Sequence, residues 1–119
     1  MNSIKSRYIR LWITITDKDV RTVLEDLVFA ITRQHMKIDL DKATDNNRIS
    51  IYPEYLYNGK FFIRMNIYVD FDDLLIKTIG LFMDAHKNNV ENIIMHLIEE
   101  NIDIISYDNN TYNKQEVIE

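Results

Sequence analysis

The sequence predicts an α+β domain built as a two-layer sandwich, with helices on one face of a mixed, mostly antiparallel sheet of about five strands. Segments 8–16 and 61–69 alternate aliphatic residues with aromatic, polar and charged ones. Because successive strand side chains point to opposite faces, each segment is predicted to be a strand with one aliphatic face. Segments 16–35 and 70–87 carry apolar residues at helical spacing and predict helices that cover this face.

The first helix is predicted to follow Thr16, a suitable capping residue, and to end near the basic residue Arg33. Alternating residues then predict a short strand over 36–41. A polar loop separates it from a strand rich in isoleucine and tyrosine over 48–57.

The connection between strands 48–57 and 61–69 contains Asn58-Gly59, a strong hairpin signal. A two-residue turn there would place Ile51 on the polar face of the partner strand, because a slip of one residue reverses every side chain. Either a longer loop or a bulge is therefore required. Pro53 favours an irregularity at 53–54 and an edge position for its strand.

The second helix is predicted to start at the acidic residues 70–73 and to run to about Lys87. Apolar residues at helical spacing predict a third helix over 90–101. The segment 102–107 alternates again and predicts the last strand.

These elements follow the order β-α-β-β-β-α-α-β within one domain, residues 1–107, which is the order of a ferredoxin-like variant. Residues 108–119 are polar and are expected to form a partly disordered tail. Right-handed crossovers predict a parallel neighbour for the first strand. The periodicities predict these core residues: Leu11, Ile13, Leu24, Leu27, Ile63, Met65, Leu75, Ile79, Phe82 and Leu97.

The composition narrows the classes of function. The chain has 119 residues, a single-domain length, with a net charge of −5 and a pI near 5.1. This acidity disfavours nucleic-acid binding, which depends on lysine and arginine, and suits a basic protein partner. The absence of cysteine fits a reducing, cytoplasmic setting. We expect no membrane partner, because no apolar run approaches the roughly 20 residues of a membrane span. We expect no signal peptide, because residues 1–5 lead directly into a charged strand.

The sequence contains no catalytic, metal or phosphate-binding motif. Three histidines occur, and none has a metal-binding spacing: His35, His86 and His96. The only glycines, Gly59 and Gly80, cannot form a phosphate-binding loop. The acidic cluster 70–73 fits helix capping better than a magnesium site. We therefore expect a protein that is not an enzyme and that holds no cofactor or metal.

The outward faces of the two long strands are the main candidate for a binding surface. They carry aromatic residues and arginines: Tyr8, Arg10, Trp12, Phe62, Arg64 and Tyr68. Tyrosine, tryptophan and arginine dominate the energetic centres of protein interfaces, so this face is predicted to bind a protein partner. Two alternatives stay open. In the first, the face binds RNA by stacking its bases on the aromatic rings. In the second, the face is covered by the third helix or by a second copy of the chain in a homodimer.

A second candidate surface is acidic and lies near the predicted third helix and last strand. It consists of Glu99, Glu100 and Asp103. Carboxylates in such a position are suited to electrostatic docking with a basic partner.

In size, acidity, lack of cysteine and α/β make-up, the chain resembles small bacterial immunity proteins, including those of contact-dependent growth inhibition systems. The resemblance implies a cytoplasmic antitoxin that neutralises a basic, nuclease-type toxin by stoichiometric binding. It rests on no motif and assigns no residue.

Two other interpretations remain. One is a small ferredoxin-like oligomeric enzyme or ligand-binding protein with a site between subunits. The other is a phage or mobile-element regulator that binds a host protein.

Overall fold

The computed structural model describes residues 4–16, 19–46, 48–55, 59–108 and 114–117. Seven strands form one sheet in the order β2-β3-β4-β1-β5-β6-β7, and every neighbouring pair is antiparallel. In chain order the elements are β1 (Ile4–Ile15), α1 (Val20–Thr32), β2 (Thr44–Asp45), β3 (Ile49–Tyr55), β4 (Phe61–Phe71), α2 (Asp73–Ala85), β5 (Val90–Leu97), the 3₁₀ helix η1 (Ile98–Glu100), β6 (Ile102–Asp108) and β7 (Lys114–Val117).

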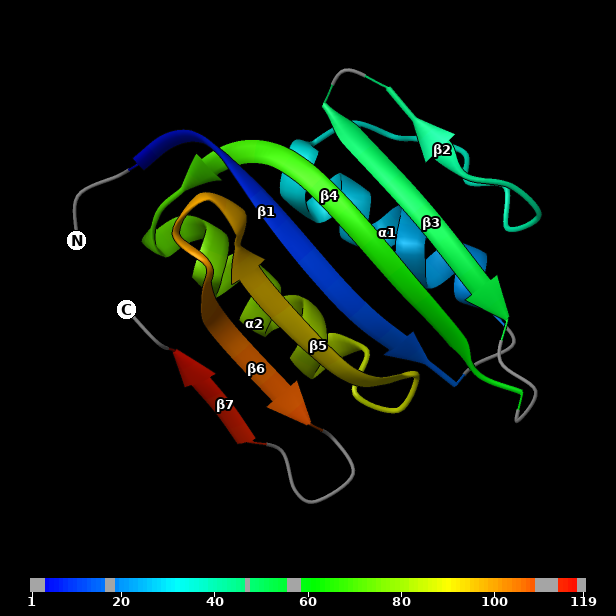
Figure 1. The fold of residues 1–119 in the computed structure, drawn as a ribbon. Helices are drawn as coiled ribbons and strands as arrows, with labels where there is room; N and C mark the ends of the chain where they lie inside the picture. Colours follow the sequence, from blue (N-terminus) through cyan, green and yellow to red (C-terminus); the bar gives the residue numbers. More distant parts are fainter. Residues whose placement is uncertain (1–3, 17–18, 47, 56–58, 109–113, 118–119) are drawn as a thin grey trace.

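The core of the sheet is built from two interleaved strand–helix–strand units (Figure 1). β4 lies between β1 and β3, and β1 lies between β4 and β5. This is the split βαβ arrangement of ferredoxin-like folds, with β6 and β7 added beyond β5. The prediction that the first strand has a parallel neighbour is therefore wrong. Each strand–helix–strand crossover joins two strands that are separated by one antiparallel strand.

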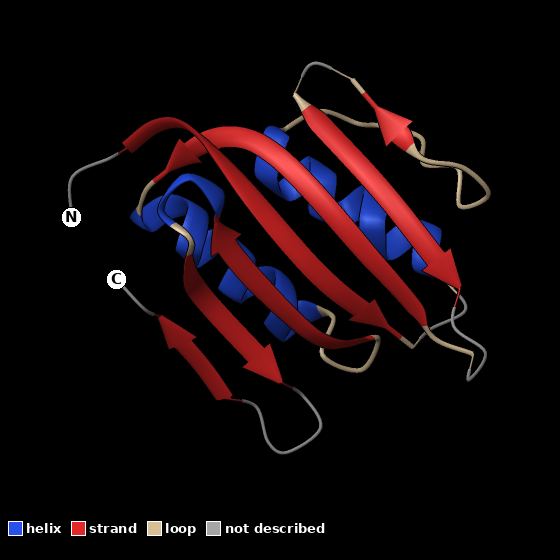
Figure 2. Ribbon diagram, in the orientation of Figure 1, coloured by secondary structure: helices blue, strands red, loops and turns tan. Residues whose placement is uncertain are grey.

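Both helices lie on the same face of the sheet, as the two layers of Figure 2 show, and the predicted two-layer α+β sandwich is confirmed. All ten predicted core residues are buried between these layers. β1 supplies the centre of the core, since Leu11 and Ile13 are fully buried and have paired strands on both sides. Among the described residues, no helix is both long and apolar enough to cross a membrane.

The predicted third helix over 90–101 is wrong, because this segment forms β5 and the short helix η1. Its apolar residues fit a helical spacing, but Ile93, Met95 and Leu97 also alternate, and these three are buried against the helices. One edge of β1 would otherwise have backbone groups without hydrogen-bond partners. The segment forms a strand because it pairs with this edge, with Ile13 opposite Ile93. The sheet therefore gains a strand, and the alternative in which a third helix covers the outward face is wrong.

The strand predicted over 36–41 is also absent. Ile38 is buried there, and its backbone N–H donates to the Glu25 carboxylate of α1 at 2.9 Å. The Asp39 carboxylate accepts from the Asp41 N–H at 2.8 Å, which forms a local turn. The segment thus holds the loop against α1, and between α1 and β3 only the two residues of β2 form strand pairs among the residues that the structure describes.

The loop between β3 and β4 is longer than two residues, and this length gives Ile51 a place in the core. Tyr55 pairs with Phe61, so the connection is five residues long, 56–60, and Asn58 lies outside the described residues. Ile51 then faces Met65 in the core, and the register runs through Pro53 without a shift. The prediction of an irregularity at 53–54 is therefore wrong, and the longer loop is what places Ile51 on the core face. Gly59 has φ +83°, a left-handed conformation that favours glycine.

The helix ends differ in part from the prediction. Asp72 caps α2 by accepting from the Leu75 N–H at 2.8 Å, as the acidic cluster indicated. The capping position of α1 is Asp19 rather than Thr16, whose backbone N–H and hydroxyl both donate to the Asn89 carbonyl. Near the C-terminus, where only a polar tail was predicted, β7 pairs with β6.

Candidate functional site

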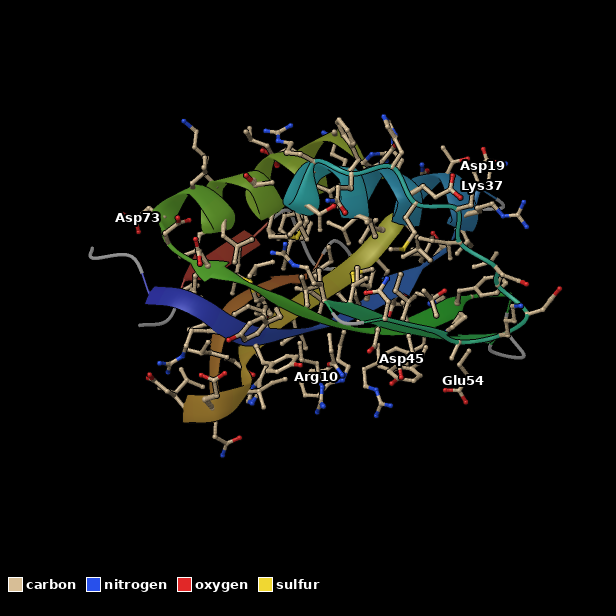
Figure 3. The ribbon with its side chains drawn as sticks, turned by 90° about the horizontal axis from the view of Figure 1, so that it is seen from above. Arg10, Asp19, Lys37, Asp45, Glu54 and Asp73 are labelled. Atoms are coloured by element: carbon tan, nitrogen blue, oxygen red, sulfur yellow. The ribbon has the colours of Figure 1, made fainter. Side chains whose placement is uncertain are left out.

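The face of the sheet opposite the helices is the candidate site. Figure 3 shows both helices on one side of the sheet, while Arg10, Asp45 and Glu54 point away from them on the other side. Among the described residues, no helix covers this side. We call it the open face, and its central part comes from alternate residues of β3, β4, β1 and β5.

At one end of the open face, Tyr8 of β1 pairs in register with Tyr68 of β4. Their ring centroids are 4.9 Å apart with the planes tilted by 46°, a favourable aromatic arrangement. Tyr8 is 44% exposed and Tyr68 is 37% exposed. The pair therefore offers rigid apolar area and hydroxyl groups to a partner.

The centre of the open face is a cross-strand row around Trp12. Trp12 lies between Arg64 of β4 and Ile94 of β5, and the row continues to Tyr52 of β3. The Arg64 guanidinium lies 4.5 Å from the centroid of the Tyr52 ring, and the Trp12 ring centroid lies 5.7 Å from that of His96. These contacts fix a planar cation beside a large aromatic surface.

The next row along the strands is polar and joined by hydrogen bonds. Arg10 of β1 pairs with Asn66 of β4 on one side and with His96 of β5 on the other. Arg10 Nε donates to Asn66 Oδ1 at 2.9 Å, and His96 Nδ1 lies 2.7 Å from Asp103 Oδ1. Because these side chains are held before any partner arrives, less conformational entropy is lost on binding.

The acidic residues that were predicted to bind a basic partner contact basic side chains of the chain itself. Glu99 and Glu100 both form ion pairs with Arg7, and Glu99 also accepts from the Tyr8 N–H at 2.9 Å. Asp103 is paired with His96. These contacts link β1 to η1 and β5 to β6, and the sequence spacing gave no indication of them.

The structure brings together the six predicted aromatic and arginine residues on one face. Phe62 is partly buried and lies between Thr14 and Glu54 in register. Sequence reasoning missed Ile94 and His96 because their segment was assigned to a helix, although the alternation of Ile93, Met95 and Leu97 was a usable signal. Tyr52 was missed because the register of β3 was unresolved.

The remaining histidines lie elsewhere and do not form a site with His96. The His35 ring stacks on Phe29 at 4.4 Å between centroids, and the His86 ring lies 4.5 Å from that of Phe82. The described residues contain no cluster of histidine, aspartate and glutamate suited to a metal ion.

A cavity of about 430 Å³ lies on the helix side of the sheet, beside the end of α1 and the start of α2. Apolar residues such as Ile31, Ile49 and Leu75 line it, and Arg33, Arg48, Asp70 and Asp72 contribute polar groups. Its described lining contains no serine, cysteine, histidine or lysine. The Asp72 carboxylate is already used as the cap of α2.

Comparison with protein-family models, with curated proteins and with solved structures finds no match for this chain. The geometry of the open face is the basis of the functional proposal.

Proposed function

We propose that this protein is a non-enzymatic binding module that docks onto a protein partner through its open face. The observation that carries the proposal is the uncovered sheet face with Trp12 at its centre and Tyr8 and Tyr68 at one end. Large aromatic side chains in fixed positions contribute most of the binding energy in protein interfaces.

Charge favours a protein over a nucleic acid as the partner. The whole chain carries −5, so it repels a polyanion at long range. On the open face, Arg10 and Arg64 are accompanied by Asp45 and Glu54 nearer the edge at β2 and β3. A mixed pattern of this kind suits the mixed surface of a folded protein better than a row of phosphates.

The action that we propose is stoichiometric inhibition, as in the immunity proteins that the chain resembles. A sheet face that covers part of a toxin prevents substrate access without any chemistry of its own. The net charge supports encounter with a partner of net positive charge, because long-range attraction raises the association rate.

The test compares two alanine variants, one on each layer. Trp12→Ala removes the centre of the open face, and Leu81→Ala removes a 59% exposed leucine from the outer surface of α2. The protein captured by the tagged wild type is purified, and its dissociation constant with each variant is measured by calorimetry. We expect one-to-one binding, at least about 30-fold weaker for Trp12→Ala, which corresponds to about 2 kcal/mol.

Leu81→Ala should bind as the wild type does. If Leu81→Ala loses binding while Trp12→Ala keeps it, the partner docks on the helices and the proposal is wrong.

A further inference from the structure

Arg10 and Arg64 occupy neighbouring positions at the centre of the open face. In the register of β1 and β4, Arg10 faces Asn66 and Trp12 faces Arg64, so the two arginines are diagonal neighbours. Diagonal neighbours on one face are separated by only about 7–8 Å, within reach of long side chains. Each guanidinium also contacts a ring, because Arg10 lies 5.9 Å from the Trp12 centroid and Arg64 lies 4.5 Å from that of Tyr52.

Neither arginine has a carboxylate partner among the residues that the structure describes. Two other cations do have one, since Arg7 contacts Glu99 and Glu100, and Lys60 contacts Glu91. Arg21 of α1, like Arg10 and Arg64, forms no ion pair with a described carboxylate. Arg10 uses its Nε to donate to Asn66, and this leaves its two terminal nitrogens available. Glu54 is the diagonal neighbour of Arg64 on the other side, but the two form no ion pair within 4.0 Å.

This arrangement costs little while water covers the face, because water screens the charges and satisfies the guanidinium donors. A partner that covers Trp12 must remove that water from both arginines. A desolvated guanidinium without an acceptor is strongly unfavourable, whereas a carboxylate that accepts two parallel hydrogen bonds compensates for the loss. The partner therefore has to supply anions at this point.

We infer that the partner inserts an acidic segment, with carboxylates placed between Arg10 and Arg64 and an apolar side chain against Trp12. This inference rests on the proposed function and adds the local chemistry of the partner. It is compatible with a partner of net positive charge. A metal-dependent nuclease combines carboxylates that hold a divalent ion with a basic surface that binds phosphate.

Synthetic probes test the inference without the natural partner. The first probe is a twelve-residue peptide in which glutamates alternate with leucine and tyrosine. Two twins replace every glutamate by glutamine or by lysine, and a single-stranded thymidine dodecamer represents nucleic acid. Binding is followed by the fluorescence of Trp12, the single tryptophan of the chain, and by the NMR signals of the Arg10 and Arg64 Nε–H groups.

We expect the glutamate peptide to bind at least about 10-fold more tightly than the glutamine twin, and the lysine twin to bind more weakly still. Arg10→Gln and Arg64→Gln should each weaken the glutamate peptide by about 5- to 10-fold. Arg21→Gln, the same change at an exposed site on α1, is the matched control and should have no effect. The Arg64 variant keeps the test decisive if loss of the Arg10–Asn66 contact impairs folding.

The outcomes separate the inference from the proposed function. Equal binding of the glutamate and glutamine peptides, still dependent on Trp12, overturns the acidic partner and leaves protein binding by this face intact. Preference for the lysine twin also overturns the inference. Tight binding of the thymidine dodecamer without binding of any peptide overturns both. No binding of any probe at millimolar concentration counts against the acidic segment.

Discussion

Replacing Leu27 by alanine tests the packing that positions the open face. Leu27 lies in the middle of α1, is 0% exposed and contributes to the single core between the helices and the sheet. Leu81 lies at a similar place in α2 but is 59% exposed. The two Leu→Ala changes alter helix propensity equally, so their difference measures burial alone.

The expected magnitude follows from the change in buried volume. Losing three methylene equivalents at about 0.8 kcal/mol each costs roughly 2.4 kcal/mol of transfer free energy. A residual cavity adds to this, because the sheet beneath α1 is fixed by the pairing of β3, β4 and β1 and cannot collapse fully. We therefore expect Leu27→Ala to lower the free energy of unfolding by about 3–4 kcal/mol, within the usual range for buried leucines.

Urea unfolding, followed by circular dichroism and by Trp12 fluorescence, measures both variants. Leu81→Ala should lose less than about 1 kcal/mol, because most of its side chain is already in water. The urea dependence of the unfolding free energy should be the same for both variants if each unfolds in one step. A loss below about 1 kcal/mol for Leu27→Ala, or equal losses for the two variants, would refute the assignment of the buried face of α1.

Three further changes give independent checks by the same unfolding assay. Tyr107 is 2% exposed and its hydroxyl has no hydrogen-bond partner among the described residues, so Tyr107→Phe should raise stability at pH 7 by about 1 kcal/mol. Burial, assisted by the charge of Asp84, raises the pKa of Tyr107 above 10.0, so the wild type should lose stability as the pH rises beyond 10.0, and the Phe variant should lack this loss. Asp72→Ala should lower the free energy of unfolding by about 1 kcal/mol, because it removes the cap of α2. Asp72→Ser should keep most of the capping stabilisation, since serine also caps helices. Lys60→Met should cost about 1–3 kcal/mol, because the Glu91 side chain, only 10% exposed, loses its ion pair with Lys60, and adding Glu91→Gln should restore part of the loss.

The local sequence determined the elements whose periodicity is unambiguous. In β1 and β4 the strict alternation identified both the core residues and the outward aromatic and arginine residues, because alternation is a property of the strand itself. In α1 and α2 the helical spacing identified the buried stripes, including Leu27 and Ile79. These patterns were sufficient for the two-layer class and for six residues of the candidate site.

Tertiary contacts decided what the local pattern left ambiguous. Segment 90–97 satisfies both periodicities, and only the free edge of β1 makes it a strand. That choice uncovers the open face and adds Ile94 and His96 to it. The ion pairs of Arg7 with Glu99 and Glu100 join residues more than ninety positions apart, so no local spacing reveals them. Local sequence specifies which face of an element is apolar, but strand neighbours and charge pairing depend on the assembled sheet, where distant segments compete for the same edges and the same counter-charges.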